Sequence, residues 1–226
     1  MHLQLGLRVL LAATAIAAFQ GCASNPYKTL DREKFSSATF VKVARYEPAN
    51  LRKPSTGSKA AAVAAYPLYF FTIVGGGVAG AMTLGIESRN GAELSERLKL
   101  PDYSELLMTK FVKAVQTEMP DWPKCSIDNE VFTDNRKEGE YHIVFRVFQA
   151  RVSPATGLNM ATDAEMFAPD QTKIWGRRFY YSSADFERFT DLAKLEANEG
   201  KLLHEEWQYA ADQTVSYFIS SLKEGK

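Results

Sequence analysis

The sequence is poor in the side chains that build metal and redox centres. Its 226 residues include only two cysteines and three histidines, and 27 basic residues balance 27 acidic ones. Zinc sites need three or four suitable ligands and nucleic-acid-binding proteins carry a basic surplus, so neither class is favoured. The hydrophobic content of 46% and the charged content of 24% are ordinary for a folded chain. They argue against a disordered or multi-pass membrane protein and predict one sizeable domain.

The first 21 residues have the pattern of a secretory signal peptide. One basic side chain, Arg8, precedes an apolar run over residues 9–19 in which only Thr14 is polar. This run is too short to span a bilayer, which takes about 20 apolar residues in a helix. A basic start, a short apolar stretch and a small residue before the cut are typical of export signals, so we predict cleavage between Gly21 and Cys22.

The residues at this position, Phe19-Gln20-Gly21-Cys22, resemble the lipobox of bacterial lipoproteins, in which a small residue precedes an invariant cysteine. Phe19 and Gln20 depart from its commonest form, which has Leu and then Ala or Ser. The resemblance implies that Cys22 is the lipid attachment site, and two or three acyl chains anchor a protein stably where one does not. It also implies the periplasmic side of the outer membrane, because Ala23 stands where lipoproteins retained in the inner membrane carry Asp.

The rest of the chain then has a single unmodified thiol, Cys125. With Cys22 acylated no internal disulfide is available, and we predict that Cys125 is buried and unreactive. The polar residues 22–35 predict a tether to the lipid, and residues 36–226 predict one periplasmic domain.

Hydrophobic periodicity predicts an α+β protein. The predicted architecture is a two-layer sandwich, an antiparallel sheet with helices on one face, closed by a long amphipathic C-terminal helix with Glu206 off its core face. Strands are predicted over residues 39–46, 126–133, 140–152, 158–167 and 173–182, and helices over residues 92–99, between Asp102 and Pro120, and over residues 185–197 and 198–223.

Residues 60–86 form an uncharged run of 27 residues that is rich in glycine. Asn90-Gly91, just beyond it, predicts a turn. One interpretation is a buried strand followed by a Gly-rich loop that packs on the domain or on another copy. The other is a membrane-contacting hairpin or helix, because the run is long enough to cross about 30 Å of hydrocarbon. The candidate membrane or partner contacts are Tyr69, Phe70, Phe71, Gly75, Gly76, Gly77 and Gly80.

Three motifs suggest chemistry but lack the partners that the chemistry needs. Residues 75–80 fit GxGxxG, which looks like the dinucleotide-binding fingerprint, but no second strand leads to an acid for the ribose. His204 begins an HExxH-like run whose second histidine position is Gln208. Asp163 and Glu165 share a strand face, which suggests weak cation binding, but the favoured interpretation is a solvated pair. We therefore predict no cofactor, no dinucleotide, no metal and no nucleic-acid partner.

Aromatic residues cluster on the last strands, and outward rings beside Arg146, Arg151, Arg177 and Arg178 would suit a protein or glycan partner, or simply pack across the strands. The segment Ile174–Tyr181, followed by a short helix and an amphipathic helix, is similar to small proteobacterial lipoproteins of unassigned role, and distantly to the curli-secretion and penicillin-binding-protein-activator lipoproteins. We predict a non-enzymatic accessory or assembly factor of an envelope complex, held by its lipid anchor and binding an envelope protein or itself. The alternative is an oligomeric secretion or pore component that inserts residues 60–86 into the membrane.

Overall fold

The computed structural model describes residues 27–53, 77–133, 139–154, 156–188 and 191–224. The predicted signal peptide, the lipobox-like residues 19–22 and most of residues 60–86 lie outside this part. The elements, in chain order, are α2 (Arg32–Phe35), β1 (Phe40–Arg45), β2 (Leu51–Arg52), α5 (Gly77–Leu98), α6 (Tyr103–Glu118), β3 (Lys124–Val131), β4 (Tyr141–Ser153), β5 (Gly157–Phe167), β6 (Lys173–Ser182) and α7 (Leu192–Glu224).

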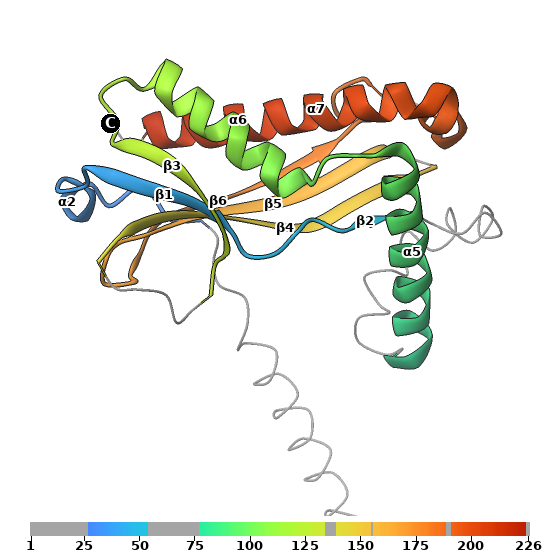
Figure 1. Cartoon of the computed structure of the whole chain (residues 1–226), viewed down its shortest axis with the longest axis horizontal. Coiled ribbons are helices and arrows are strands. Elements are labelled where there is room, and N and C mark those ends of the chain that lie inside the picture. The colour runs from blue at the N-terminus through green and yellow to red at the C-terminus, as the bar shows by residue number, and fades with distance from the viewer. Residues whose placement is uncertain (1–26, 54–76, 134–138, 155, 189–190, 225–226) are drawn as a thin grey trace, which may run out of the picture.

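One twisted sheet forms the centre of the molecule, with the strand order β3-β1-β4-β5-β6 and β2 paired to the far end of β4 (Figure 1). The α+β class and the predicted strands are confirmed, but the predicted antiparallel sheet is wrong in part. Strands β4, β5 and β6 are antiparallel, whereas β1 runs parallel to both β3 and β4. The chain returns to the sheet through helices after β1, and such crossovers permit parallel neighbours. The sheet is therefore mixed.

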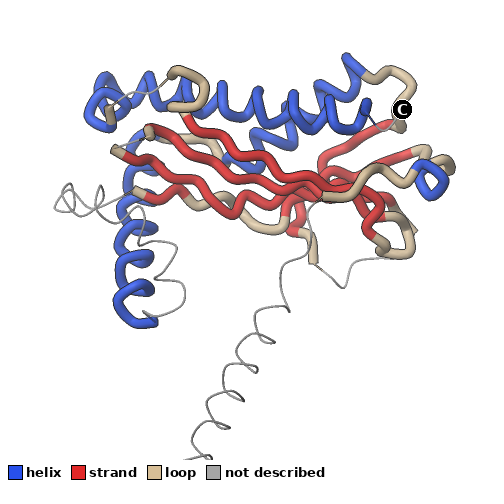
Figure 2. The backbone as a smooth tube through the Cα atoms, turned by 180° about the vertical axis from the view of Figure 1, so that it is seen from behind, coloured by secondary structure: helices blue, strands red, loops and turns tan. Residues whose placement is uncertain are grey.

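Helices α6 and α7 cover one face of this sheet, as the sequence predicted (Figure 2). Asp102 caps α6 by accepting hydrogen bonds from the backbone N–H groups of Ser104 and Glu105. The core lies between the layers, where the ring of Phe145 in β4 contacts Phe111 in α6 and Phe218 in α7. Burial of this apolar layer fixes which face of each strand points toward the helices.

The domain begins earlier than residue 36. Lys28 and Gly176 exchange two backbone hydrogen bonds, of 2.9 and 3.0 Å, so the N-terminal segment extends the sheet at its β6 edge. Leu30 is buried and the backbone N–H of Asp31 donates to Ile174. The second half of the predicted tether is thus part of the folded body.

Helix α5 corrects the predicted turn at Asn90-Gly91, because the helix runs without a break through both residues. Gly91 lies against β2, where a Cβ atom would fall 1.9 Å from the carbonyl oxygen of Leu51. The glycine therefore permits close packing of helix on strand and does not end the helix. Within the described residues, no helix combines the length and apolar character needed to cross a bilayer.

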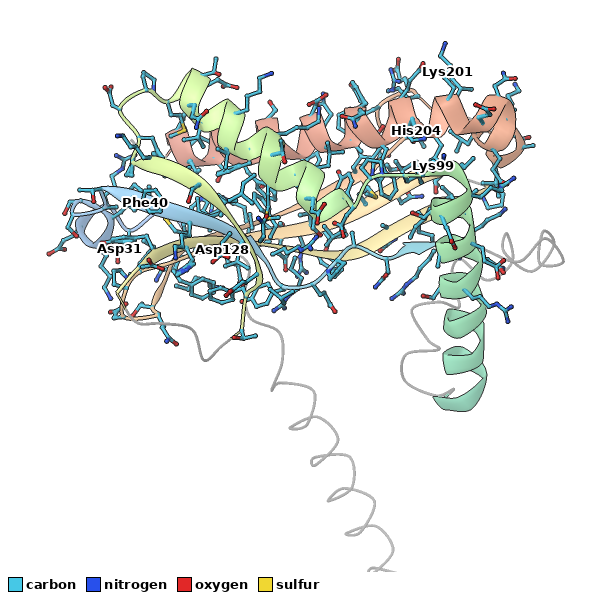
Figure 3. The ribbon with its side chains drawn as sticks, viewed as in Figure 1. Asp31, Phe40, Lys99, Asp128, Lys201 and His204 are labelled. Atoms are coloured by element: carbon cyan, nitrogen blue, oxygen red, sulfur yellow. The ribbon has the colours of Figure 1, made fainter. Side chains whose placement is uncertain are left out.

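Helix α7 begins later and bends where the sequence predicted two helices. Residues 183–187 form turns, and regular helical geometry is interrupted from Ala197 to Gly200, where Asn198, Glu199 and Gly200 have positive φ. The long helix predicted over residues 198–223 is confirmed beyond this bend. His204 then meets the end of α5, where its Nε2 lies 2.8 Å from the carbonyl oxygen of Leu98 (Figure 3). This contact satisfies a terminal helix carbonyl and ties α5 to α7.

Candidate binding surface on the open face of the sheet

The face of the sheet that points away from α6 and α7 is called the open face here. Paired residues in a ladder project to the same side, and Phe145 and Ala164 form a pair on the helix side. The next row along the strands, Arg146, Asp163 and Arg178, therefore projects from the open face. The same alternation places Lys42, His142, Glu165, Lys173 and Tyr180 on this side.

Two acids on this face are buried, which corrects their interpretation as a solvated pair. Asp163 is 5% exposed and Glu165 is 6% exposed. Arg178 binds both oxygens of Asp163, with Nε at 2.6 Å and an Nη atom at 2.7 Å, and Lys173 Nζ lies 3.0 Å from Glu165. A carboxylate loses its water shell at such a position and is stable there only with charged partners. Both acids therefore serve the ion pairs of the sheet.

The pairing with Asp163 also sets the electrostatics of Arg178. The hydrogen bonds from the guanidinium to that carboxylate raise the pKa of Arg178 further above its ordinary high value. The guanidinium carbon lies 4.5 Å from the centroid of the Phe148 ring, and Phe148 meets Tyr180 edge to face. Arg178 is consequently held between a carboxylate and an aromatic face and always carries its charge.

Arg146 occupies the other end of the same row in a different environment. Its guanidinium carbon lies 4.0 Å from the centroid of the Tyr46 ring. Tyr46 belongs to an aromatic group in which Phe132 meets Tyr46 edge to face and stacks on Phe167, with ring centroids 5.4 and 5.5 Å apart. His142 also lies against Phe132. Within the described residues Arg146 has no carboxylate partner, so one face of the cation meets a ring and its N–H donors remain for a ligand.

Two large side chains project beside these stacks. Tyr180 is 59% exposed and Phe148 is 38% exposed. Phe148 is on this side by simple alternation, because it lies two residues after Arg146. The pairing of β4 with β5 shifts register between Val147 and Gln149, so Gln149, which pairs with Ala161, is on this side as well. Such bulges redirect a side chain, and no periodicity in the sequence announces them. The position of Phe148 was therefore predictable, whereas that of Gln149 was not.

A second polar cluster lies on the helix side and corrects the predicted position of Glu206. This carboxylate is 4% exposed. It accepts hydrogen bonds from the hydroxyls of Tyr181 and Ser183, at 2.8 and 2.9 Å, and from Nε of Arg188 at 2.7 Å. Burial and the bond to Glu206 raise the pKa of Tyr181. The signal was present in the sequence, because Glu206 lies three residues after Leu203 and four before Ala210 in the apolar stripe.

The remaining predicted site residues are distributed as follows. Gly21 and Cys22, together with Tyr69, Phe70, Phe71, Gly75 and Gly76, lie outside the described residues, while Gly77 and Gly80 lie in the first turns of α5. Cys125 is a free, buried thiol, and burial raises its pKa to about 11. No group of three or more metal-ligating side chains occurs within the residues that the structure describes.

The comparisons with known proteins do not identify a family for this chain. No protein-family model matches the sequence, and no curated protein matches it. Among solved structures, the chain has a distant structural similarity to the crystal structure of protein XCC0632 from Xanthomonas campestris, of family DUF330. The identity is 15%, the TM-score is 0.27, and the similar region covers 54% of this chain and 66% of that chain. The similar region thus spans less than two thirds of XCC0632, and a likeness at this level carries no conclusion about function.

Proposed function

We propose that the protein is a lipoprotein anchored through Cys22 on the periplasmic side of the outer membrane, where it acts as a non-enzymatic accessory or assembly factor by binding an envelope protein. The observation that carries the binding role is the row of Arg146, Asp163 and Arg178 on the open face, with Arg146 and Arg178 stacked on Tyr46 and Phe148. Arginine and aromatic side chains are enriched in the cores of protein interfaces.

The short segment between Cys22 and Lys28 supports a position of the folded domain close to the membrane. Lys28 is fixed to β6 through Gly176, and only five residues separate Lys28 from Cys22. Six extended steps span about 20 Å, so an acylated Cys22 would keep the β6 edge within about that distance of the lipid surface. Tyr180 of β6 would then lie near the membrane and within reach of a membrane-associated partner.

The anchor is tested by metabolic labelling with a radioactive fatty acid. The wild-type chain should incorporate the label and float with outer membranes, whereas Cys22→Ser should do neither. An Ala23→Asp variant should keep its label and move to the inner membrane. Incorporation of label by Cys22→Ser would contradict the anchor.

The binding role is tested by placing a photocrosslinking amino acid at Tyr180 in the native cells. Leu202, an exposed apolar residue of α7 on the other side of the sheet, is the matched control position. We expect a discrete crosslinked protein from position 180 and none from position 202. The absence of any crosslink from position 180, or equal crosslinks from both positions, would count against the open face as the interface.

A second candidate function is an oligomeric secretion or pore component that inserts residues 60–86. Its support is the uncharged stretch of 27 residues, which continues into the N-terminal turns of α5. Alkaline extraction of the Cys22→Ser protein separates the two candidates. Full release into the aqueous fraction favours the accessory factor, and retention in the membrane favours insertion.

A further inference from the structure

Within the proposed function, we propose that Arg146, seated on the ring of Tyr46, binds a carboxylate side chain in an acidic, aromatic-containing segment of the protein partner. The inference rests on the open face as the interface, and it assigns the chemistry of the contact. In this inference Arg146 binds the ligand, whereas Arg178 stabilises the sheet through its ion pair with Asp163.

The distribution of charge on the open face distinguishes these two arginines. Both oxygens of Asp163 are occupied by Arg178, at 2.6 and 2.7 Å. Three other basic side chains on this face are also paired, since Lys42 reaches Glu140, Arg151 reaches Glu87 and Lys173 reaches Glu165. In the described part of the chain Arg146 also reaches no carboxylate, as is true of Arg52 and Lys124 near the two ends of this face. Arg146 lies in the central row and over the ring of Tyr46, so a ligand carboxylate there would form an ion pair beside an aromatic side chain.

The ring of Tyr46 covers one side of Arg146, whose guanidinium carbon lies 4.0 Å from the ring centroid. A guanidinium can form two parallel hydrogen bonds with a ligand from a side that the ring does not cover. A carboxylate matches the planar arrangement of the guanidinium N–H groups, and one carboxylate is sufficient to accept both hydrogen bonds. The half-buried position of Arg146 reduces the screening of its charge by water.

The surroundings favour a peptide over an anionic lipid surface. Recognition of anionic lipid takes clusters of basic residues, whereas here the acids Asp163, Glu165 and Glu140 lie among the bases. The exposed rings of Tyr180 and Phe148 instead offer apolar contact beside the cation. An acidic residue flanked by aromatic residues would use both features.

The direct test measures fluorescence anisotropy of a labelled peptide with two glutamates between two phenylalanines, added to the full chain purified in detergent. We expect the wild-type chain to bind this peptide about tenfold more tightly than the same peptide with glutamines, a factor worth about 1.4 kcal/mol. The Arg146→Gln variant should abolish the difference. Arg146→Lys keeps the charge but loses the planar fork, so this variant should show a smaller affinity difference between the two peptides than the wild-type chain does. Arg89→Gln is the matched control, because Arg89 is 82% exposed and pairs with Glu93 on α5.

Equal binding of both peptides to the wild-type chain, or unchanged discrimination in Arg146→Gln, would overturn the inference. If Arg146→Gln does not fold, as judged by circular dichroism, Arg146→Lys decides, and unchanged discrimination there has the same meaning. Binding of the Cys22→Ser chain to phosphatidylglycerol vesicles that depends on Arg146, without peptide discrimination, would replace the peptide by a lipid surface and also overturn it.

The same variants separate this inference from the proposed function. If position 180 crosslinks a protein in cells and Arg146→Gln leaves the crosslinking yield unchanged, the open face remains the proposed interface. The ligand-binding role of Arg146 is then wrong. If position 180 crosslinks nothing, the proposed interface fails, and the peptide measurement decides on Arg146 alone. Loss of the crosslink in Arg146→Gln, with Arg89→Gln unaffected, supports both.

Discussion

Asp163 and Arg178 lie opposite each other on neighbouring strands and form a two-point ion pair in the middle of the open face. The guanidinium Nε is 2.6 Å from one carboxylate oxygen and an Nη atom is 2.7 Å from the other. The acid is buried, while 28% of the Arg178 side chain remains exposed. Removing the base therefore leaves a buried anion, whereas removing the acid leaves a cation that can turn toward water.

This asymmetry predicts unequal costs for the two single substitutions. Arg178→Ala should lower the free energy of unfolding by about 3 kcal/mol, and Asp163→Ala should cost less, because an unpaired buried charge is the larger penalty. The double variant should be more stable than the sum of the two losses implies. Urea unfolding of all four proteins measures the coupling. Losses that simply add would show that the pair contributes no coupling, contrary to its geometry.

Glu206 is predicted to hold the chain after β6 against α7. Glu206→Ala would leave the hydroxyls of Tyr181 and Ser183 and the guanidinium of Arg188 without their shared acceptor, so we expect a loss of about 3 kcal/mol in the free energy of unfolding. The neighbouring, exposed Glu205 gives the control Glu205→Ala, for which we expect a change within about 0.5 kcal/mol. Equal effects at both positions would mean that the buried cluster does not stabilise the helix.

Periodicity was sufficient for most of the fold. The strands around residues 40–45 and 141–182 and the helix that begins at Tyr103 follow patterns of alternation, spacing and capping that are local to each segment. The row of Arg146 and Arg178 also follows from alternation, because it lies one residue away from the buried Phe145 and the partly buried Phe179. Of the four arginines predicted beside outward rings, Arg177 is the exception, because it pairs with Ala164 on the helix side.

Features that depend on contacts between distant segments could not be predicted in the same way. The parallel pairing of β1 with β3 and β4 depends on where the chain returns after its helices. The burial of Asp163 requires Arg178, which lies 15 residues away in the sequence. The glycine at position 91 of α5 is explained by the backbone of Leu51, which leaves no room for a Cβ atom. In each case a tertiary partner overrides the local preference.

Gly91 should be intolerant of any side chain. A Cβ atom would lie 1.9 Å from the Leu51 carbonyl oxygen and 2.8 Å from the Cα of Arg52, and both are backbone atoms that cannot turn away. Gly91→Ala should therefore separate α5 from β2 and lower the free energy of unfolding by at least about 2 kcal/mol, although alanine favours helix.

Ser95→Ala, one turn further along α5, is the control, and we expect it to be neutral or slightly stabilising. Thermal unfolding of both variants, compared with the wild-type chain, measures the effect. A Gly91→Ala protein as stable as the wild type would show that α5 and β2 do not pack this closely.

Cys125 should react slowly with thiol reagents and should make stability fall at alkaline pH. Burial raises the pKa of its thiol to about 11 from an ordinary value of 9.0, and the thiol lies 3.5 Å from the carbonyl oxygen of Pro123. The thiolate population at pH 8 is then about a hundred times smaller than that of an ordinary thiol, so labelling by a disulfide reagent should be slower by a similar factor in the folded Cys22→Ser protein than after unfolding in urea.

The sign of the pH effect follows from where the proton is held. Between pH 9 and about 11 the unfolded chain releases the thiol proton while the folded chain keeps it, so the stability that is present below pH 9 is lost as the pH rises through this window. Burial also raises the pKa values of Tyr103 and Tyr181, and these residues add to the loss above pH 10. The contribution of Cys125 is therefore the difference in urea midpoint between the Cys22→Ser protein and the same protein with Cys125→Ala, followed from pH 8 to pH 10.5. As the pH rises, we expect the urea midpoint of the Cys125→Ala protein to increase relative to that of the protein with Cys125. A difference in midpoint that does not change with pH would mean that the thiol has the same pKa in the folded and unfolded states.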